Sequence, residues 1–208
     1  MPILTMGMNH KTAPVELREK MAFSGSTLEE GLDRLLSFSH LQEVVILSTC
    51  NRTEIYAAVE NLKEGRFDLA GFISREKSLT EEDLAAHFYV FQGREAVEHL
   101  FRVACGLDSL VVGETQILGQ VKEAYLAAAK SQAVGKTLHN LFNQALRVGK
   151  RAHSETSISD NAVSVSYAAV ELAKKIFDNL EGRKVLIVGA GKMGELTARH
   201  LVSFGVVG

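Results

Sequence analysis

Two apolar runs joined by a short polar link constrain the fold of this chain more than any other feature. Val44–Leu47 and Ile55–Val59 are rich in aliphatic residues, a pattern that predicts two buried β-strands. The link between them, Ser48–Glu54, is polar and contains Cys50. We therefore expect a rigid sheet to hold this cysteine at a strand end while the link exposes it.

The segments around these strands predict an α/β sandwich. Ser26–Glu30 is a capping-box-like start for a helix that continues to about Phe38. The other elements expected before residue 92 are a strand at 3–8, a helix at 15–23, a helix at 67–77, a polar turn at 81–83 and a strand at 87–91. The resulting β-α-β-β-α-β order is typical of a ferredoxin-like fold.

The second half of the chain changes to a helical pattern. An apolar stripe from Arg94 is broken at Gly106 and Gly113, and long helices are predicted at 114–133, 136–153 and 162–180, followed by a strand at 184–188. The polar segment 154–161 is the first candidate boundary. We predict a catalytic domain at 1–153, a linker and spine helix at 154–181, and the start of a Rossmann domain at 182–208.

Composition narrows the class of protein. The net charge is −2, so any contact with RNA has to come from a local patch. Cys50 and Cys105 are the two cysteines, too few for a disulfide framework and suited to a reducing cytoplasm. Cysteine and histidine clusters at zinc spacing, a basic leader and an apolar run of about 18 residues are absent, so we expect no metal, no signal peptide and no membrane span.

Cys50 and Arg52 allow two interpretations. A cysteine beside an apolar strand is commonly a small core residue, whereas a nucleophile needs a thiolate favoured by a nearby cation. In an extended chain Arg52 points to the same side as Cys50. It can then support a thiolate or clamp a substrate carboxylate, although a solvated arginine is the commoner outcome.

A glycine turn near the end of the chain predicts a dinucleotide site. Gly189, Ala190, Gly191, Lys192, Met193 and Gly194 follow the predicted strand and precede a helical pattern at 195–204. This context aims a helix N-terminus at a pyrophosphate, although a glycine turn without a ligand remains the alternative. The residue that selects NAD or NADP is expected about 20 positions further on, beyond Gly208.

Other polar residues remain ambiguous by themselves. Glu114, Thr115, Gln116 and Gln120 at a helix start can hold a small polar ligand or serve only as capping and solvated residues. His99 lies on an apolar helix face, and the sequence offers it no proton partner. A basic group that can meet RNA phosphates or simply be solvated comprises Lys136, Arg147, Lys150 and Arg151.

Taken together, these segments resemble the glutamyl-tRNA reductases over essentially the whole chain. The motifs that carry the resemblance are 48–54, 104–109, 113–120, 149–151, 162–166 and the glycine turn. The resemblance implies NADPH-dependent reduction of glutamyl-tRNA(Glu) to glutamate-1-semialdehyde, the first step of one route to tetrapyrroles such as porphyrins. It implies that Cys50 is the nucleophile, that His99 matters for activity and that Gly189–Gly194 holds NADPH. The residues that it implies for the glutamyl pocket are Thr49, Asn51, Arg52, Ser109, Glu114, Thr115, Gln116 and Gln120.

The resemblance also sets expectations for partners and for the chain as it stands. It implies a homodimer for the full-length protein and glutamate-1-semialdehyde aminomutase as the downstream partner. The chain looks like an N-terminal piece whose cofactor domain is unfinished, so we expect it to deacylate glutamyl-tRNA through a Cys50 thioester rather than reduce it. A non-catalytic tRNA- or nucleotide-binding module of the same fold is the alternative.

Overall fold

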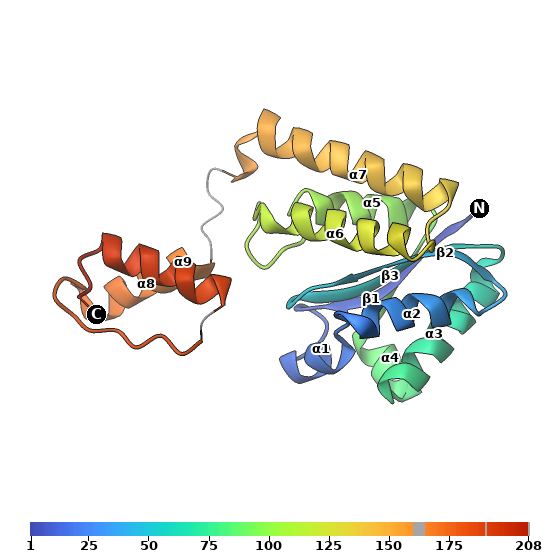
Figure 1. The fold of residues 1–208 in the computed structure, drawn as a ribbon, viewed down its shortest axis with the longest axis horizontal. Helices are drawn as coiled ribbons and strands as arrows, with labels where there is room; N and C mark the ends of the chain where they lie inside the picture. The colour runs from blue at the N-terminus through green and yellow to red at the C-terminus, as the bar shows by residue number, and fades with distance from the viewer. Residues whose placement is uncertain (160–164, 190, 208) are drawn as a thin grey trace.

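A four-stranded antiparallel sheet forms the centre of the N-terminal part of the molecule (Figure 1). The computed structural model describes residues 1–159, 165–189 and 191–207. The strands are β1 (Ile3–Asn9), β2 (Leu41–Ser48), β3 (Arg52–Val59) and β4 (Tyr89–Gln92), in the spatial order β2-β3-β1-β4. This order, with every neighbouring pair antiparallel, confirms the predicted ferredoxin-like sandwich.

Helices cover both faces of the sheet. Figure 1 shows α1 (Val15–Met21), α2 (Ser26–Leu36), α3 (Leu62–Lys77) and α4 (Glu81–His87) below it. The added helices α5 (Arg94–Ala104), α6 (Gln116–Lys130) and α7 (Lys136–Glu155) lie above it, and the short 3-10 helix η1 (Ser157–Ser159) follows. Because both faces are covered, every residue of β3 is buried, including its polar ones.

A buried carboxylate from the sheet fixes the start of α7. Gly135 at the N-cap of α7 has no capping side chain, so the first N–H groups of the helix need other acceptors. The Glu43 carboxylate accepts the N–H of Thr137 at 3.0 Å and of Leu138 at 2.7 Å. A Cβ at position 135 would lie 2.8 Å from Glu43 Oε1, so a glycine permits this approach.

Three sequence predictions about helix starts are wrong in detail. No side chain caps α2, whose N-cap is Gly25, and Thr27 Oγ1 instead accepts the N–H of Ser24. The helix expected from 67 begins at Leu62, because Asn61 accepts the next free N–H groups. The polar turn at 81–83 is the first turn of α4, where Thr80 and Asp83 form a capping box.

The C-terminal helices form a separate unit. Helices α8 (Val165–Phe177) and α9 (Lys192–Ser203) pack around their own apolar cluster, which includes Val170, Leu201 and Val206. The strand predicted at 184–188 is not formed, and Leu186 and Val188 are 88% and 91% exposed. The reason is physical: a strand exists only through its hydrogen-bonded neighbour, and the described residues provide none. Part of the predicted linker, 160–164, lies outside the described residues.

Candidate active site

Cys50 lies at the exposed tip of the β2–β3 hairpin. The turn is closed by the N–H of Thr49, which donates to the carbonyl of Arg52 at 2.8 Å. Thr49 Oγ1 in turn accepts the N–H groups of Asn51 and Arg52. The thiol is therefore exposed on a rigid support, as the sequence predicted, and the interpretation of Cys50 as a core residue is wrong.

A small polar pocket opens beside the thiol. The hairpin contributes residues 49–52, and the loop after α5 and the start of α6 contribute the remainder. Seven of the lining residues, besides Cys50, are ones that the sequence analysis named: Thr49, Asn51, Arg52, Ser109, Glu114, Gln116 and Gln120. Thr115, also predicted, is the N-cap of α6 and does not line the pocket, because α6 begins at Gln116 and not at 114.

Two features of the pocket bear on ligand binding. Ser109 Oγ is buried and has no hydrogen-bond partner among the described residues, so it is available to a ligand. The cavity measures about 30 Å³, roughly the share of one water molecule in the liquid. A glutamyl side chain is larger than this volume, so the pocket as it stands does not enclose one.

Arg52 is the buried floor of this pocket. Its side chain is only 1% exposed, which contradicts the solvated arginine that the sequence left open. Nη1 donates to Glu54 Oε1 at 2.8 Å, and Nη2 donates to the carbonyl of Asp108 at 2.6 Å. The Asp108 carboxylate also pairs with Lys11 at 2.5 Å. The guanidinium orientation is therefore determined by groups far apart in the sequence.

Glu54 is the centre of a buried network that the sequence analysis missed. Besides Arg52, its carboxylate accepts the hydroxyls of Tyr56 at 2.6 Å and Tyr89 at 2.5 Å, and it contacts His99 Nε2 at 2.8 Å. Burial alone would raise the pKa of Glu54, but the charge of Arg52 and the hydrogen bond from His99 lower it to about 2. Arg52, Glu54 and Tyr56 are two residues apart in an apolar strand, so their side chains point to the same face of the sheet. This spacing was the sequence signal that could have revealed the network.

His99 faces a different cavity from the one beside Cys50. Its cavity measures about 550 Å³ and is also lined by Tyr89, Phe91, Arg102 and Asp108. Among the described residues, His99 does not line the Cys50 pocket. It contacts Glu54, which pairs with Arg52, and Arg52 lines that pocket. Its proton partner is Glu54, a contact that only the fold creates. Cys105 is buried as expected for a packing residue, and burial raises the pKa of its thiol.

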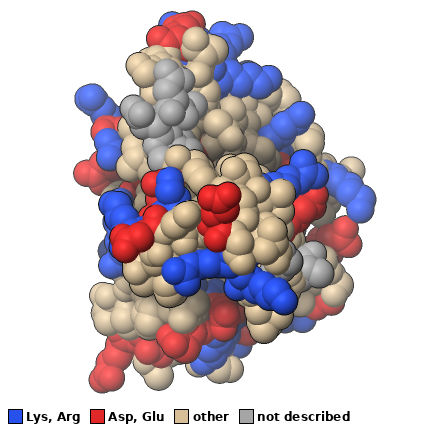
Figure 2. Space-filling view, turned by 90° about the vertical axis from the view of Figure 1, so that its left-hand side faces the viewer, with Lys and Arg blue, Asp and Glu red and all other residues tan. Residues whose placement is uncertain are grey.

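The basic residues predicted on α7 differ in their pairing. Arg151 pairs with Glu155 at 2.9 Å on the same helix, whereas Lys136, Arg147 and Lys150 are exposed. On the face shown in Figure 2, basic and acidic side chains are interspersed. This mixture agrees with the small net charge of the chain.

The glycine turn has part of the geometry expected of a dinucleotide site. Gly189 has a φ of 118°, and Gly191 is the N-cap of α9, so the turn leads directly into a helix N-terminus. A Cβ on Gly194 would lie 2.9 Å from the carbonyl oxygen of Gly189, which only glycine avoids. Ala190 lies outside the described residues, and the strand that should precede the turn is not formed.

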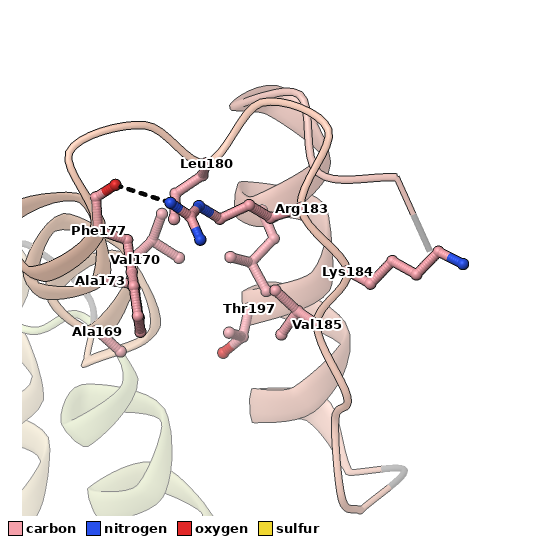
Figure 3. Close-up of a pocket in the computed structure, with 10 residues that line it drawn as sticks. Ala169, Val170, Ala173, Phe177, Leu180, Arg183, Lys184, Val185 and Thr197 are labelled. Atoms are coloured by element: carbon pink, nitrogen blue, oxygen red, sulfur yellow. Dashed lines mark hydrogen bonds between the residues drawn. The ribbon is translucent and has the colours of Figure 1, made fainter.

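The C-terminal unit also contains an apolar cavity of about 590 Å³ (Figure 3). Side chains from α8, from α9 and from the segment after Gly182 line it, and Arg183 Nη2 donates to the Phe177 carbonyl at 3.2 Å. Its lining is mainly aliphatic, including Ala169, Val170, Leu180 and Leu201. Cys50 and seven of the predicted polar residues lie elsewhere, at the Cys50 pocket.

The described residues contain neither a metal-binding cluster nor a membrane-spanning helix. They contain no group of three or more histidine, cysteine or acidic side chains placed to hold a metal ion. No helix among them has the length and apolar character that crossing a bilayer requires.

The fold and the site define a class of protein: a ferredoxin-like domain that presents a cysteine beside a polar pocket and continues towards a dinucleotide-type turn. The family described as glutamyl-tRNAGlu reductase, N-terminal domain, matches residues 6–156. The chain therefore belongs to the glutamyl-tRNA reductase family. The family described as shikimate / quinate 5-dehydrogenase matches residues 171–207.

Individual relatives agree with this assignment. The chain is 53% identical over 205 residues to the glutamyl-tRNA reductase of Shouchella clausii and 51% identical over 206 residues to that of Bacillus subtilis. Each alignment covers 99% of this chain and 45% of the relative, so the chain spans about half their length. The solved glutamyl-tRNA reductase from Methanopyrus kandleri is 41% identical, with a TM-score of 0.70 over 98% of this chain and 47% of that one.

Proposed function

We propose that this chain carries the acyl-transfer site of an NADPH-dependent glutamyl-tRNA reductase, which forms glutamate-1-semialdehyde for tetrapyrrole synthesis. The observation that carries the proposal is the exposed Cys50 thiol at the rim of a pocket lined by seven of the predicted polar residues. The family assignment supports the same activity.

The reaction begins at the hairpin tip. The Cys50 thiolate attacks the carbonyl carbon of the glutamyl ester, the ester C–O bond breaks, and the tRNA leaves with a proton on its ribose oxygen. The glutamyl group remains on the sulfur as a thioester. The rigid turn built by Thr49 supports this step because it holds the nucleophile in place while the substrate approaches.

Substrate recognition is assigned to the polar lining of the pocket. Ser109 Oγ, which is buried without a partner among the described residues, donates to the glutamyl group, and Gln116 and Gln120 add amide contacts. The charge of Arg52 attracts the side-chain carboxylate of the substrate. Glu54 and Asp108 occupy much of the guanidinium fork, so Arg52 acts as a rigid positive floor.

Reduction requires a hydride donor next to the thioester. The close approach of Gly194 to Gly189 and the helix N-terminus after Gly191 fit a pyrophosphate, so residues 189–194 are the part of this chain that would hold NADPH. The cofactor supplies the hydride when it is bound. Glu54 orients His99 through Nε2, and His99 faces the larger cavity on the other side of the Arg52–Glu54 pair, so its proposed part in activity acts through that pair and not by contact with the thioester.

The remaining assignments follow from the same proposal. The catalytic domain spans 1–153, the linker and spine helix 154–181, and the start of the cofactor domain 182–208. The proposed setting is the cytoplasm, with a homodimeric full-length enzyme and glutamate-1-semialdehyde aminomutase as the enzyme that takes the product.

Incubation of the 208-residue chain with charged glutamyl-tRNA tests the proposal. Because the described residues after Gly182 form no paired strand, we expect slow release of free glutamate, with little semialdehyde even when NADPH is present. The Cys50→Ser variant is the control. Release no faster than in this control would contradict the acyl-transfer assignment and favour a binding module, whereas efficient semialdehyde formation would contradict only the expected loss of reduction.

A further inference from the structure

An arginine outside every predicted motif contacts the backbone of Cys50. Arg18 on α1 donates from Nη1 to the carbonyl oxygen of Cys50 at 2.7 Å and to Asn51 Oδ1 at 3.2 Å. Both acceptors belong to neutral groups at the hairpin tip. The half-buried guanidinium is therefore anchored to the hairpin tip that carries the thiol, through the backbone of Cys50 and the side chain of Asn51.

The guanidinium of Arg18 retains capacity to bind an anion. Its Nε is buried and has no partner among the described residues, and no carboxylate in this part of the chain forms an ion pair with it. Arg52, by comparison, pairs with both Glu54 and Asp108. Arg18 is thus a cation without an ion-pair partner among the described residues, and such a group favours an anion with several acceptor oxygens, such as a phosphate.

Neighbouring groups strengthen the positive character of this rim. The N–H of His10 donates to the carbonyl of Asn51 at 2.9 Å, which places the His10–Lys11 turn at the hairpin. Burial first, and then the charges of Lys11, Arg52 and Arg18, lower the pKa of His10, whereas Asp108 opposes the shift. Lys11 and Arg52 are each paired with a carboxylate, so Arg18 is the cation on this side of Cys50 for which the described residues show no ion pair.

We propose that Arg18 is a phosphate-binding residue of the site, and that it holds the 5′-phosphate of the terminal nucleotide whose ribose carries the glutamyl ester. This inference rests on the proposed function. Its chemical reason is that the ester attacked by Cys50 and this phosphate belong to the same nucleotide. A cation fixed to the carbonyl of Cys50 therefore meets the phosphate when the ester meets the thiol.

Two minimal substrates that differ by one phosphate provide the test. Adenosine 5′-monophosphate and adenosine are each esterified with glutamate on the ribose, and kcat/KM for deacylation is measured with the full 208-residue chain. We expect the phosphorylated ester to react about tenfold or more faster, as one charge-assisted contact allows. Arg18→Gln should remove this preference, so that the two esters react at the same rate in this variant, whereas Arg18→Lys should keep part of the preference.

Arg66→Gln is the matched control, because Arg66 is exposed on α3, which begins past the end of β3 opposite to the hairpin. This variant should retain the full preference for the phosphate. The rate of Cys50 alkylation by iodoacetamide reports the hairpin itself and should be the same in the wild type and in Arg18→Gln. An equal loss with both esters, together with altered alkylation, would mean that Arg18 only supports the turn, and would overturn the proposal.

A binding measurement separates this inference from the proposed activity. Adenosine 5′-monophosphate should slow alkylation of Cys50 in the wild type, adenosine should not, and the protection should disappear in Arg18→Gln. This readout needs no turnover, so it decides the phosphate site even if neither ester nor glutamyl-tRNA is deacylated. Equal protection by adenosine 5′-monophosphate and adenosine, or protection that survives in Arg18→Gln, would refute the proposed phosphate site.

Discussion

Replacement of Glu54 by glutamine tests whether the buried network stabilises the fold through charge. The carboxylate is fully buried and contacts Arg52, Tyr56, Tyr89 and His99. Its pKa is lowered from 4.5 to about 2, a difference that corresponds to about 3 kcal/mol of stability at neutral pH. Glutamine cannot supply the charge and presents an NH₂ group to these donors, so we expect a loss of about this size.

The pH dependence of this loss has a definite sign. A carboxyl group with a lowered folded-state pKa stabilises the protein above its unfolded pKa of 4.5 and loses that effect as the pH falls towards 2. The wild type should therefore lose stability through this window, whereas Glu54→Gln lacks this contribution at every pH. The two free energies of unfolding should differ most near pH 7 and converge in acid.

Urea unfolding followed by circular dichroism at several pH values between 7 and 3 measures both effects. Tyr89→Phe is the control, because it removes one hydroxyl donor at 2.5 Å and keeps the charge pair. It should cost about 1 kcal/mol and preserve the acid dependence. A Glu54→Gln protein as stable as the wild type at pH 7, or a difference that does not change with pH, would refute the reasoning.

Three further predictions concern the thiol, the pocket floor and the C-terminal segment. Cys50→Ser should abolish deacylation, since an alcohol without a dedicated base is a poor nucleophile, whereas Cys105→Ser should retain it; the reverse result in paired kinetic assays would exclude Cys50. Arg52→Lys should lose much of the preference for glutamyl- over glutaminyl-tRNA, because an ammonium cannot reproduce both contacts to Glu54 and Asp108; unchanged discrimination would remove Arg52 from recognition. Amide hydrogens at 184–188 should exchange quickly, because no strand pairs with them, and strong protection in a proven monomer would contradict this expectation.

Local chemistry in the sequence was sufficient for much of the fold and for the exposure of Cys50. The aliphatic runs around 48–54 predicted two strands, and the polar link between them predicted an exposed Cys50, because both depend on neighbours along the chain. The polar residues of 109–120 were ambiguous by themselves, and it was the family resemblance that grouped Ser109, Glu114, Gln116 and Gln120 at the pocket. The cap of α2 and the start of α3 were missed because capping depends on backbone geometry that composition does not specify.

Only the tertiary structure decided which partners these residues have. Arg52 appeared free in the sequence, yet Asp108 and Glu54 both bind it, and His99 obtains its partner from the same carboxylate. Nothing in the sequence marked Arg18 as a residue of the site, and it reaches the carbonyl of Cys50 at the hairpin tip from α1. The physical reason is that a buried polar group must find a partner wherever packing brings one, whatever the separation along the chain. The apolar pattern of 184–188 was typical of a strand. A strand forms only when a second segment pairs with it, and the described residues do not supply that second segment.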